Sequence, residues 1–287
     1  MSSSAPPPRF VAPPPRPLAD PERETAWRPW MAPSALIGGF LAAFMGQLII
    51  AAVGSLFGTP VSDPSPAVNI LATLWQDICF VGAAIFLARS VGPVSPGQFG
   101  LRKTDFWRAV LIVVGTFVAF TILSGLWSQL IGIRGDDELP DSLGVDRSTY
   151  ALVAVCVLVT VVAPLAEEFL FRGFFFGALR NWRGVWPAAI ITGVVFGAIH
   201  GAGTDAEFLP LLMLLGFLLC VVRWVTRSLL PCIALHAVNN SLAFGVTAAD
   251  WQWWAVVLLI VGAVSACMLI CWPFVGRRSD QAIGAAT

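Results

Sequence analysis

The sequence predicts an all-α fold, that of a polytopic membrane protein with about eight transmembrane helices and with both termini on the cytosolic side. The first observation is composition: 57% of the 287 residues are hydrophobic, only 12% are charged, and the mean hydropathy is +0.80. Soluble domains carry about 45–50% apolar and about 25% charged residues, and a soluble fold of this length could not bury so much apolar surface. The other two observations are the repeated long apolar stretches and the one-sided distribution of basic residues between them.

Residues 1–33 differ from the rest of the chain, because they hold 10 of its 21 prolines. Such a segment cannot form a packed core, so we expect a disordered or polyproline tail in the cytosol. A signal peptide is not expected here, because no apolar core follows a short basic start.

After the tail come eight apolar stretches long enough to cross about 30 Å of hydrocarbon, which takes about 20 helical residues. Backbone groups in lipid must be hydrogen-bonded within the protein, so these stretches are expected to be helices. They are residues 34–58, 67–88, 107–131, 150–180, 185–203, 207–226, 228–247 and 251–275. We group them into three N-terminal membrane helices (34–131), a helical core (148–248), and a last helix with a short cytosolic tail (251–287).

The basic residues predict the orientation of these helices, since cytosolic loops carry an excess of arginine and lysine. With the N-terminus in the cytosol, the outside loops hold only Arg134 and Arg147, and Arg172 lies within a span. The other 14 of the 17 basic residues then lie on the inside. This bias predicts that both termini are cytosolic.

The charge balance bears on the partners of the protein. Basic and acidic residues number 17 each, so no basic surplus is present to neutralise phosphates, and nucleic acid is not an expected partner. The expected partner is a lipid bilayer, and the proline-rich tail favours the plasma membrane of a bacterium.

Three charged residues lie together in the fourth stretch, where an ionisable group costs at least about 2.5–3.5 kcal/mol and usually marks function. They are Glu167, Glu168 and Arg172, set among phenylalanines. Adjacent helical residues point about 100° apart, so the two carboxylates cannot share one task. Glu168 precedes Arg172 by four residues, the favourable order for a helical ion pair, and this pair would leave Glu167 directed elsewhere. The alternative, a helix end with all three side chains reaching water, fits the surrounding phenylalanines poorly.

His200 lies in the fifth stretch beside a stripe of small residues, Gly193, Gly197 and Gly201. Such stripes let helix backbones approach closely. A turn midway between Glu167 and His200 would place both at nearly the same depth. The alternative is a histidine that only packs in the core.

Two further sets of polar residues lie in other stretches. His236 and Asn240 are four residues apart in the seventh stretch, so they share a helix face. Asp77 lies in the second stretch, where we expect a structural role, paired with Arg172 or with a polar group of another span.

Together, Glu167, His200, His236 and Asn240 can converge on one buried pocket. Glu167 and His200 could hold and deprotonate a water molecule, while His236 and Asn240 could donate hydrogen bonds to a developing oxyanion. Such a site would hydrolyse an acyl bond, most simply a peptide bond. Glu167, His200 and His236 are also an acceptable three-ligand zinc set with an open position, so zinc-bound and metal-free water remain alternatives.

Three motifs in this order resemble the pattern of the CPBP intramembrane proteases, which include the type II CAAX prenyl endopeptidases and the bacterial bacteriocin-processing and immunity relatives. The motifs are Glu167-Glu168-x-x-x-Arg172, Phe196-x-x-x-His200 and His236-x-x-x-Asn240. The resemblance covers about residues 148–248.

The resemblance implies a helical membrane core with a site open to the cytosolic side and a membrane-associated or prenylated peptide as substrate. It implies that water is activated by Glu167 and His200 and that the oxyanion is stabilised by His236 and Asn240. The residues it implies as supporting are Glu168, Arg172 and Phe196. It leaves the metal open, because the family has been described as both glutamic and metallo-type.

Two other functions use the same residues. One is a non-catalytic immunity or scaffold protein that keeps the fold. The other is a proton-coupled transporter, since buried Glu, Asp, His and Arg are also the parts of a proton relay. The absence of an evident internal repeat in the sequence argues against the transporter.

Overall fold

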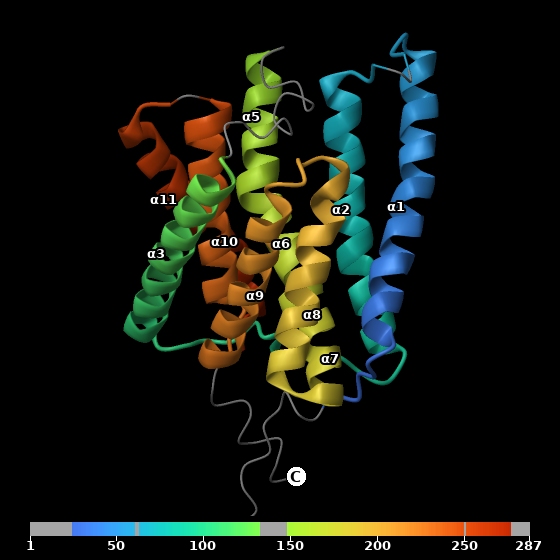
Figure 1. Ribbon diagram of the computed structural model, residues 1–287. Coiled ribbons are helices and arrows are strands. Elements are labelled where there is room, and N and C mark those ends of the chain that lie inside the picture. The colour runs from blue at the N-terminus through green and yellow to red at the C-terminus, as the bar shows by residue number, and fades with distance from the viewer. Residues whose placement is uncertain (1–24, 61–62, 133–147, 250, 277–287) are drawn as a thin grey trace, which may run out of the picture.

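The computed structural model describes residues 25–60, 63–132, 148–249 and 251–276 (Figure 1). Within these ranges the chain is built of helices and contains no strand, only an isolated bridge between Arg102 and Gly276. Seven helical segments of the described residues are long and apolar enough to cross a membrane, and the seventh of the eight predicted spans, 228–247, corresponds to a shorter apolar helix, Leu230–Val246. The predicted all-α, multi-pass membrane fold is therefore confirmed, while the cytosolic placement of both termini stays a prediction.

The first three helices match the first three predicted spans. They are α1 (Met31–Leu56), α2 (Pro66–Arg89) and α3 (Phe106–Ile131). Proline at the first position starts α2, where its missing N–H costs nothing. The Asp105 side chain caps α3 by accepting a hydrogen bond from the Arg108 backbone N–H. A short 3-10 turn, η1 (Pro96–Phe99), lies between α2 and α3.

The end of the predicted proline-rich tail is packed onto the helices. Residues 1–24 lie outside the described residues, but Trp27 is only 4% exposed and its ring contacts Phe99 and Phe174. The Asn181 side-chain amide donates hydrogen bonds to the backbone oxygens of Thr25 and Trp27. These contacts order residues 25–33, and α1 begins at Met31 rather than at residue 34.

The fourth span is one continuous 35-residue helical segment, Thr149–Arg183, with two wider π-helical stretches inside it. Its parts are α5 (Thr149–Val157), η3 (Leu158–Val162, π), α6 (Ala163–Glu168), η4 (Phe169–Phe175, π) and α7 (Phe176–Arg183). Such π turns occur frequently at functional sites. Gly184, with φ of 80°, then reverses the chain in a conformation that favours glycine.

The fifth and sixth spans pack backbone to backbone through their glycines. They are α8 (Val185–Ala198), which ends in the 3-10 turn η5 (Ile199–Ala202), and α9 (Leu209–Thr226). A methyl group added at Gly193 would lie 2.7 Å from the backbone nitrogen of Phe217, and one at Gly197 would lie 2.7 Å from that of Met213. Two of the three glycines in the predicted stripe therefore allow this close approach.

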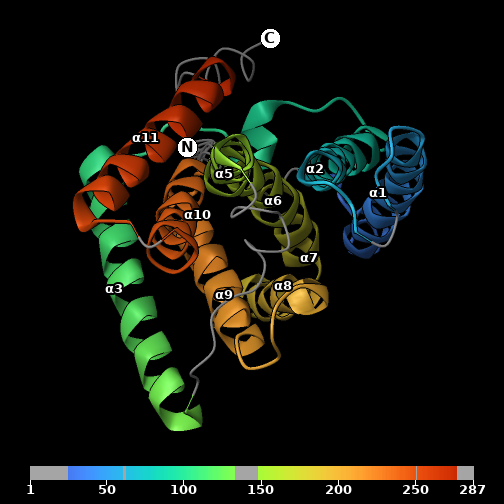
Figure 2. The same ribbon diagram turned by 90° about the horizontal axis from the view of Figure 1, so that it is seen from above.

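The last two spans complete the bundle. They are α10 (Leu230–Ala243), extended by the π-helical η6 (Phe244–Ala248), and α11 (Trp253–Cys271), extended by the 3-10 turn η7 (Trp272–Phe274). Figure 2 shows α6 and α10 in the middle of the bundle, with α1, α3 and α11 around them. α10 packs against α3, α6, α9 and α11, so its polar residues point into protein rather than lipid.

The outer helices expose the apolar side chains that a bilayer would cover. Among the described residues of α3 none is buried, and Leu111 and Leu126 are 73% and 57% exposed. Apolar surface on this scale is not stable in water. The ends of α2, α7 and α9, which carry Arg89, Arg183 and Arg227, lie together at the lower end of Figure 1.

Candidate active site

A cavity of about 420 Å³ lies among the central helices and is lined by all four predicted catalytic residues. Glu167 comes from α6, His200 from η5, and both His236 and Asn240 come from α10. The remaining wall is mostly apolar and includes Phe40, Phe80, Leu158, Phe196, Leu212, Leu215 and Phe244. The structure thus brings together side chains from three helical segments that the sequence places far apart.

The two adjacent glutamates face different surroundings, as their helical spacing predicts. The Glu167 side chain lines the cavity and is 17% exposed. The Glu168 side chain is 0% exposed, and its Oε1 lies 2.7 Å from Nη1 of Arg172, which is also 0% exposed. The predicted ion pair between Glu168 and Arg172 is therefore present, and it leaves Glu167 directed into the cavity.

Arg172 is held on several sides at once. Its Nη2 donates a hydrogen bond to the Gly216 backbone oxygen at 3.1 Å, and its guanidinium carbon lies 4.3 Å from the centre of the Phe196 ring. A buried charge needs such a set of partners, because its desolvation is costly. Phe196, predicted as a supporting residue, thus packs against the guanidinium.

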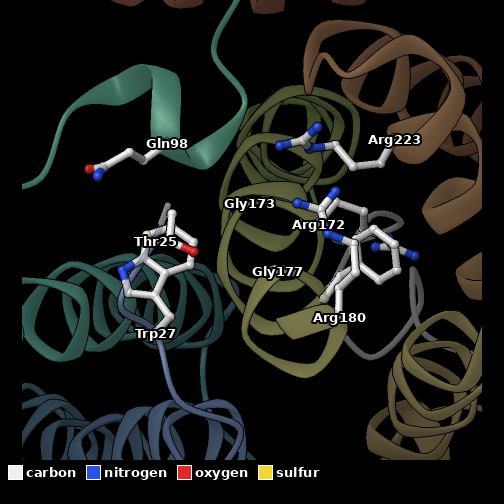
Figure 3. A pocket seen from close by; sticks show the side chains of 9 residues that line it. Thr25, Trp27, Gln98, Arg172, Gly173, Gly177, Arg180 and Arg223 are labelled. Atoms are coloured by element: carbon white, nitrogen blue, oxygen red, sulfur yellow. The ribbon is translucent and has the colours of Figure 1, made fainter. Parts of the chain in front are cut away.

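Figure 3 shows Arg172 from the side of a second, much smaller pocket of about 10 Å³, which is also lined by Thr25, Trp27, Arg180 and Arg223. A cavity of this size holds about one water molecule. It is therefore too small to bind a substrate group, despite its arginines.

His236 is oriented by the buried glutamate. Its Nδ1 lies 2.8 Å from Glu168 Oε1, and its Nε2 lies 3.9 Å from Glu167 Oε2. Because the Glu168 carboxylate is paired with Arg172 and can only accept, Nδ1 carries the proton of this hydrogen bond. The contact fixes the ring so that Nε2 faces the cavity.

His200 is oriented by its own helix. Its Nδ1 donates to the Phe196 backbone oxygen at 2.7 Å, and its ring packs on the Phe196 ring with centres 5.0 Å apart. A carbonyl oxygen only accepts, so the proton sits on Nδ1 and Nε2 remains as an acceptor in the neutral ring. His200 and Glu167 share the cavity without a direct contact between them among the described interactions.

Asn240 is held by a carbonyl of the π-helical stretch η3. Its side-chain Nδ2 donates to the Val159 backbone oxygen at 3.0 Å, and its Oδ1 accepts from Asn239 Nδ2 at 3.3 Å. The carboxamide has two N–H donors, so one donor remains for a group in the cavity.

Asp77 also lines this cavity, from α2, and is 4% exposed. The predicted pairing of Asp77 with Arg172 is not found among the described contacts. Arg172 instead contacts Glu168, Gly216, Phe171 and Phe196. The Asp77 Oδ2 atom is buried with no hydrogen-bond partner among the described residues.

The predicted zinc ligands Glu167, His200 and His236 line the same cavity. Among the described residues, no three His, Cys, Asp or Glu side chains come together in a group that could hold a metal ion. The three side chains therefore do not fit a metal ion in this arrangement.

Sequence reasoning missed two features of this site. The contact between Glu168 and His236 joins residues of different helices and has no signal in local spacing. The π-helical stretches η3 and η4, which flank both glutamates, have no signature in an apolar sequence.

The fold and the cavity define an all-helical, multi-pass membrane protein with a carboxylate, two imidazoles and a carboxamide around one buried space. Residues 149–242 match the family described as "Type II CAAX prenyl endopeptidase Rce1-like". This match supports the resemblance to the CPBP family that the three motifs predict.

Curated relatives come from three bacteria. The chain is 32% identical over 108 residues to an Escherichia coli protein named "Uncharacterized 24.3 kDa protein". The aligned residues make up 36% of this chain and 49% of the relative. It is 29% identical over 174 residues to the Bacillus subtilis (strain 168) protein named "Putative membrane peptidase YdiL", over 58% of this chain and 69% of the relative. It is 27% identical over 141 residues to "UPF0177 protein YxdF" of Lactococcus lactis, over 48% of this chain and 74% of the relative.

The chain therefore spans about half the length of the Escherichia coli relative and more of the other two. No solved structure matches the chain.

Proposed function

We propose that the protein is an intramembrane endopeptidase that hydrolyses a peptide bond of a membrane-associated or prenylated peptide, in the plasma membrane of a bacterium. The observation that carries the proposal is the single cavity lined by Glu167, His200, His236 and Asn240. The match to the CAAX endopeptidase family and the bacterial peptidase relative support the same reaction class.

In the proposed reaction, Glu167 is the general base and His200 helps to hold the attacking water. Oε2 of Glu167 has no hydrogen-bond partner among the described residues, and Nε2 of His200 is left to the cavity. A water held by these two acceptors gives one proton to Glu167 as its oxygen attacks the carbonyl carbon. The same proton then passes to the amine of the leaving segment as the C–N bond breaks.

The negative oxygen formed in this attack needs donors in place before the reaction begins. Asn240 has one N–H left for it, and His236 presents Nε2. For this role His236 must carry a proton on Nε2 as well as the proton on Nδ1, which it donates in the hydrogen bond to Glu168. Donors aimed at an oxyanion in a water-poor site are each worth about 10²–10³ in rate.

The test is the reaction of purified protein in lipid vesicles with peptides that end in a CAAX sequence, with and without a prenyl group on the cysteine. We expect cleavage by the wild type and almost none by Glu167→Gln, with unchanged thermal unfolding. Asp205→Asn, a change of an exposed acidic residue, is the matched control and should cleave normally.

The outcomes separate the alternatives. Normal turnover by Glu167→Gln would remove this glutamate from the mechanism. A cellular phenotype that persists in Glu167→Gln would favour a non-catalytic immunity or scaffold role. Ion or solute flux into vesicles that is lost in Glu167→Gln would favour a proton-coupled transporter.

A further inference from the structure

Asp77 is a buried acidic residue that the proposed reaction does not use. It lies on α2, which packs against α6 and η4, the segments that carry Glu167, Glu168 and Arg172. Its side chain lines the same cavity as Glu167, and its Oδ2 has no hydrogen-bond partner among the described residues. A buried carboxylate oxygen without a partner needs an explanation.

The polar neighbours of Asp77 on α2 that also line the cavity are bonded to other groups. The Thr73 hydroxyl donates to the Asn69 backbone oxygen of its own helix, and the Gln76 side-chain oxygen accepts from Gln47. The buried arginine of the site is bonded to Glu168 and to the Gly216 backbone oxygen. The other acidic residue that lines this cavity is Glu167, which is also an acceptor.

Two acidic side chains that line one cavity do not stabilise each other, because like charges repel. They do suit a ligand that brings hydrogen-bond donors. Glu167 Oε2 and Asp77 Oδ2 are both buried acceptors with no hydrogen-bond partner among the described residues, and both residues line this cavity.

A peptide is such a ligand. The bond to be cleaved must lie exposed in the cavity, so the backbone N–H groups beside it are not paired within the peptide and need acceptors there. Most of the cavity wall is apolar and offers them nothing. A carboxylate that accepts one of these N–H groups would therefore hold the segment in the cavity beside Glu167.

We propose that Asp77 is a substrate-binding residue, whose carboxylate accepts a hydrogen bond from a backbone N–H of the peptide in the cavity. The inference rests on the proposed peptidase function and adds a contact to the substrate on the α2 side. The contact forms with the bound peptide and persists as the bond is cleaved, so it acts on binding rather than on the chemical step.

The experiment measures KM and kcat of the reconstituted protein for a prenylated CAAX peptide, with Asp77→Ala, Asp77→Asn and the control Thr121→Val. Thr121 lies on α3, outside the cavity lining, and its hydroxyl is bonded to the Phe117 backbone oxygen of its own helix. A hydrogen bond to a charged group is worth enough that Asp77→Ala should raise KM by about tenfold or more, with kcat within about threefold. Asp77→Asn keeps an acceptor and should raise KM by less, and Thr121→Val should leave both constants nearly unchanged.

A second measurement compares the wild type with Asp77→Asn, so it does not depend on whether Asp77→Ala folds. Peptides are methylated at one backbone nitrogen at a time, which removes one N–H from each. We expect one position at which methylation raises KM in the wild type and raises it less in Asp77→Asn. If no such position exists, or if Asp77→Ala folds and keeps the wild-type KM, Asp77 does not bind the peptide backbone.

Failure of this inference is distinguishable from failure of the proposed function. If the wild type cleaves no peptide, the peptidase proposal fails. If the wild type cleaves, Glu167→Gln does not, and Asp77→Ala matches the wild type, only the role of Asp77 fails. A loss in Asp77→Asn as large as in Asp77→Ala, confined to peptides with basic side chains, would instead mean that Asp77 recognises charge, which would also overturn the proposal.

Discussion

The Nδ1 atom of His236 lies 2.8 Å from Oε1 of Glu168, and this same oxygen lies 2.7 Å from Nη1 of Arg172. One buried carboxylate oxygen therefore joins three side chains from two helical segments. It compensates the charge of Arg172 and sets the direction in which His236 faces the cavity. The second glutamate of the pair is thus as important to the geometry of the site as the first.

This arrangement predicts that Glu168→Gln destabilises the protein strongly. The substitution leaves Arg172 as a buried charge without a counter-ion, and breaking a buried pair in this way costs about 3–5 kcal/mol. Thermal unfolding in detergent should show the loss, together with a fall in peptide cleavage. Glu207→Gln, a change of an exposed residue, is the control.

The double variant Glu168→Gln with Arg172→Met should recover part of that stability, because replacing both members of a buried pair is far less costly than removing one. Activity should stay low, since His236 loses its carboxylate partner. A Glu168→Gln variant with wild-type unfolding temperature and activity would contradict this account.

Asn240 and its neighbour offer a matched test of the oxyanion role. Asn240→Ala should lower kcat by about 10²–10³ with little change in KM, because it removes a donor that acts in the transition state. Asn239→Ala should lower kcat far less, because the Asn240 Nδ2 group stays bonded to the Val159 backbone oxygen when the Asn239 contact to Oδ1 is lost. A kcat for Asn240→Ala within about threefold of the wild type would make the oxyanion role untenable.

The glycines between α8 and α9 predict a stability effect. An alanine at Gly197 would place its methyl group 2.7 Å from the Met213 backbone nitrogen and 2.9 Å from the Leu209 backbone oxygen. Both are main-chain atoms, so the helices must separate, and we expect Gly197→Ala to cost about 1–3 kcal/mol, the usual range for overpacking.

Gly262→Ala is the control for this comparison, because nothing lies within 4 Å of the methyl group it adds to α11. Replacing an open helical glycine by alanine should raise stability by up to about 1 kcal/mol. The two variants should therefore shift the unfolding temperature in opposite directions, and equal shifts would argue against close backbone packing at Gly197.

Metal dependence is tested by chelation. The proposed reaction uses Glu167 and His200 on a water without a metal, so activity should survive dialysis against a strong zinc chelator. Inductively coupled plasma analysis of the dialysed protein shows whether metal was removed. Activity that is lost on chelation and restored by zinc would contradict the metal-free reaction and would favour Glu167, His200 and His236 as ligands.

Much of the fold follows from the sequence, because the thickness of the hydrocarbon sets helix length and the apolar composition marks where helices lie. The third predicted span, 107–131, differs by one residue from α3 (Phe106–Ile131). The boundary at residue 33 differs more, because Trp27 is held by tertiary contacts with Phe99 and Phe174 that local composition does not encode.

The site could be predicted where its geometry is local. The spacing of Glu168 and Arg172 by one helical turn predicts their ion pair, which the structure contains. The same spacing of His236 and Asn240 predicts a common helix face, and both line the cavity. The role of Asp77 could not be obtained in this way. The sequence marks it as a charge in an apolar span, but its surroundings depend on how α2 packs against α6.

The π-helical stretch η3 has a consequence for chain length. Val159, whose carbonyl oxygen accepts from Asn240, lies in this stretch, and Glu167 follows it in α6. Deleting a single residue of Leu158–Val162 would return the turn to α-helical bonding and rotate one side of the break by about 100° relative to the other. The carbonyl that holds Asn240 and the carboxylate of Glu167 would then no longer face the same space, so both contacts depend on the number of residues in this stretch.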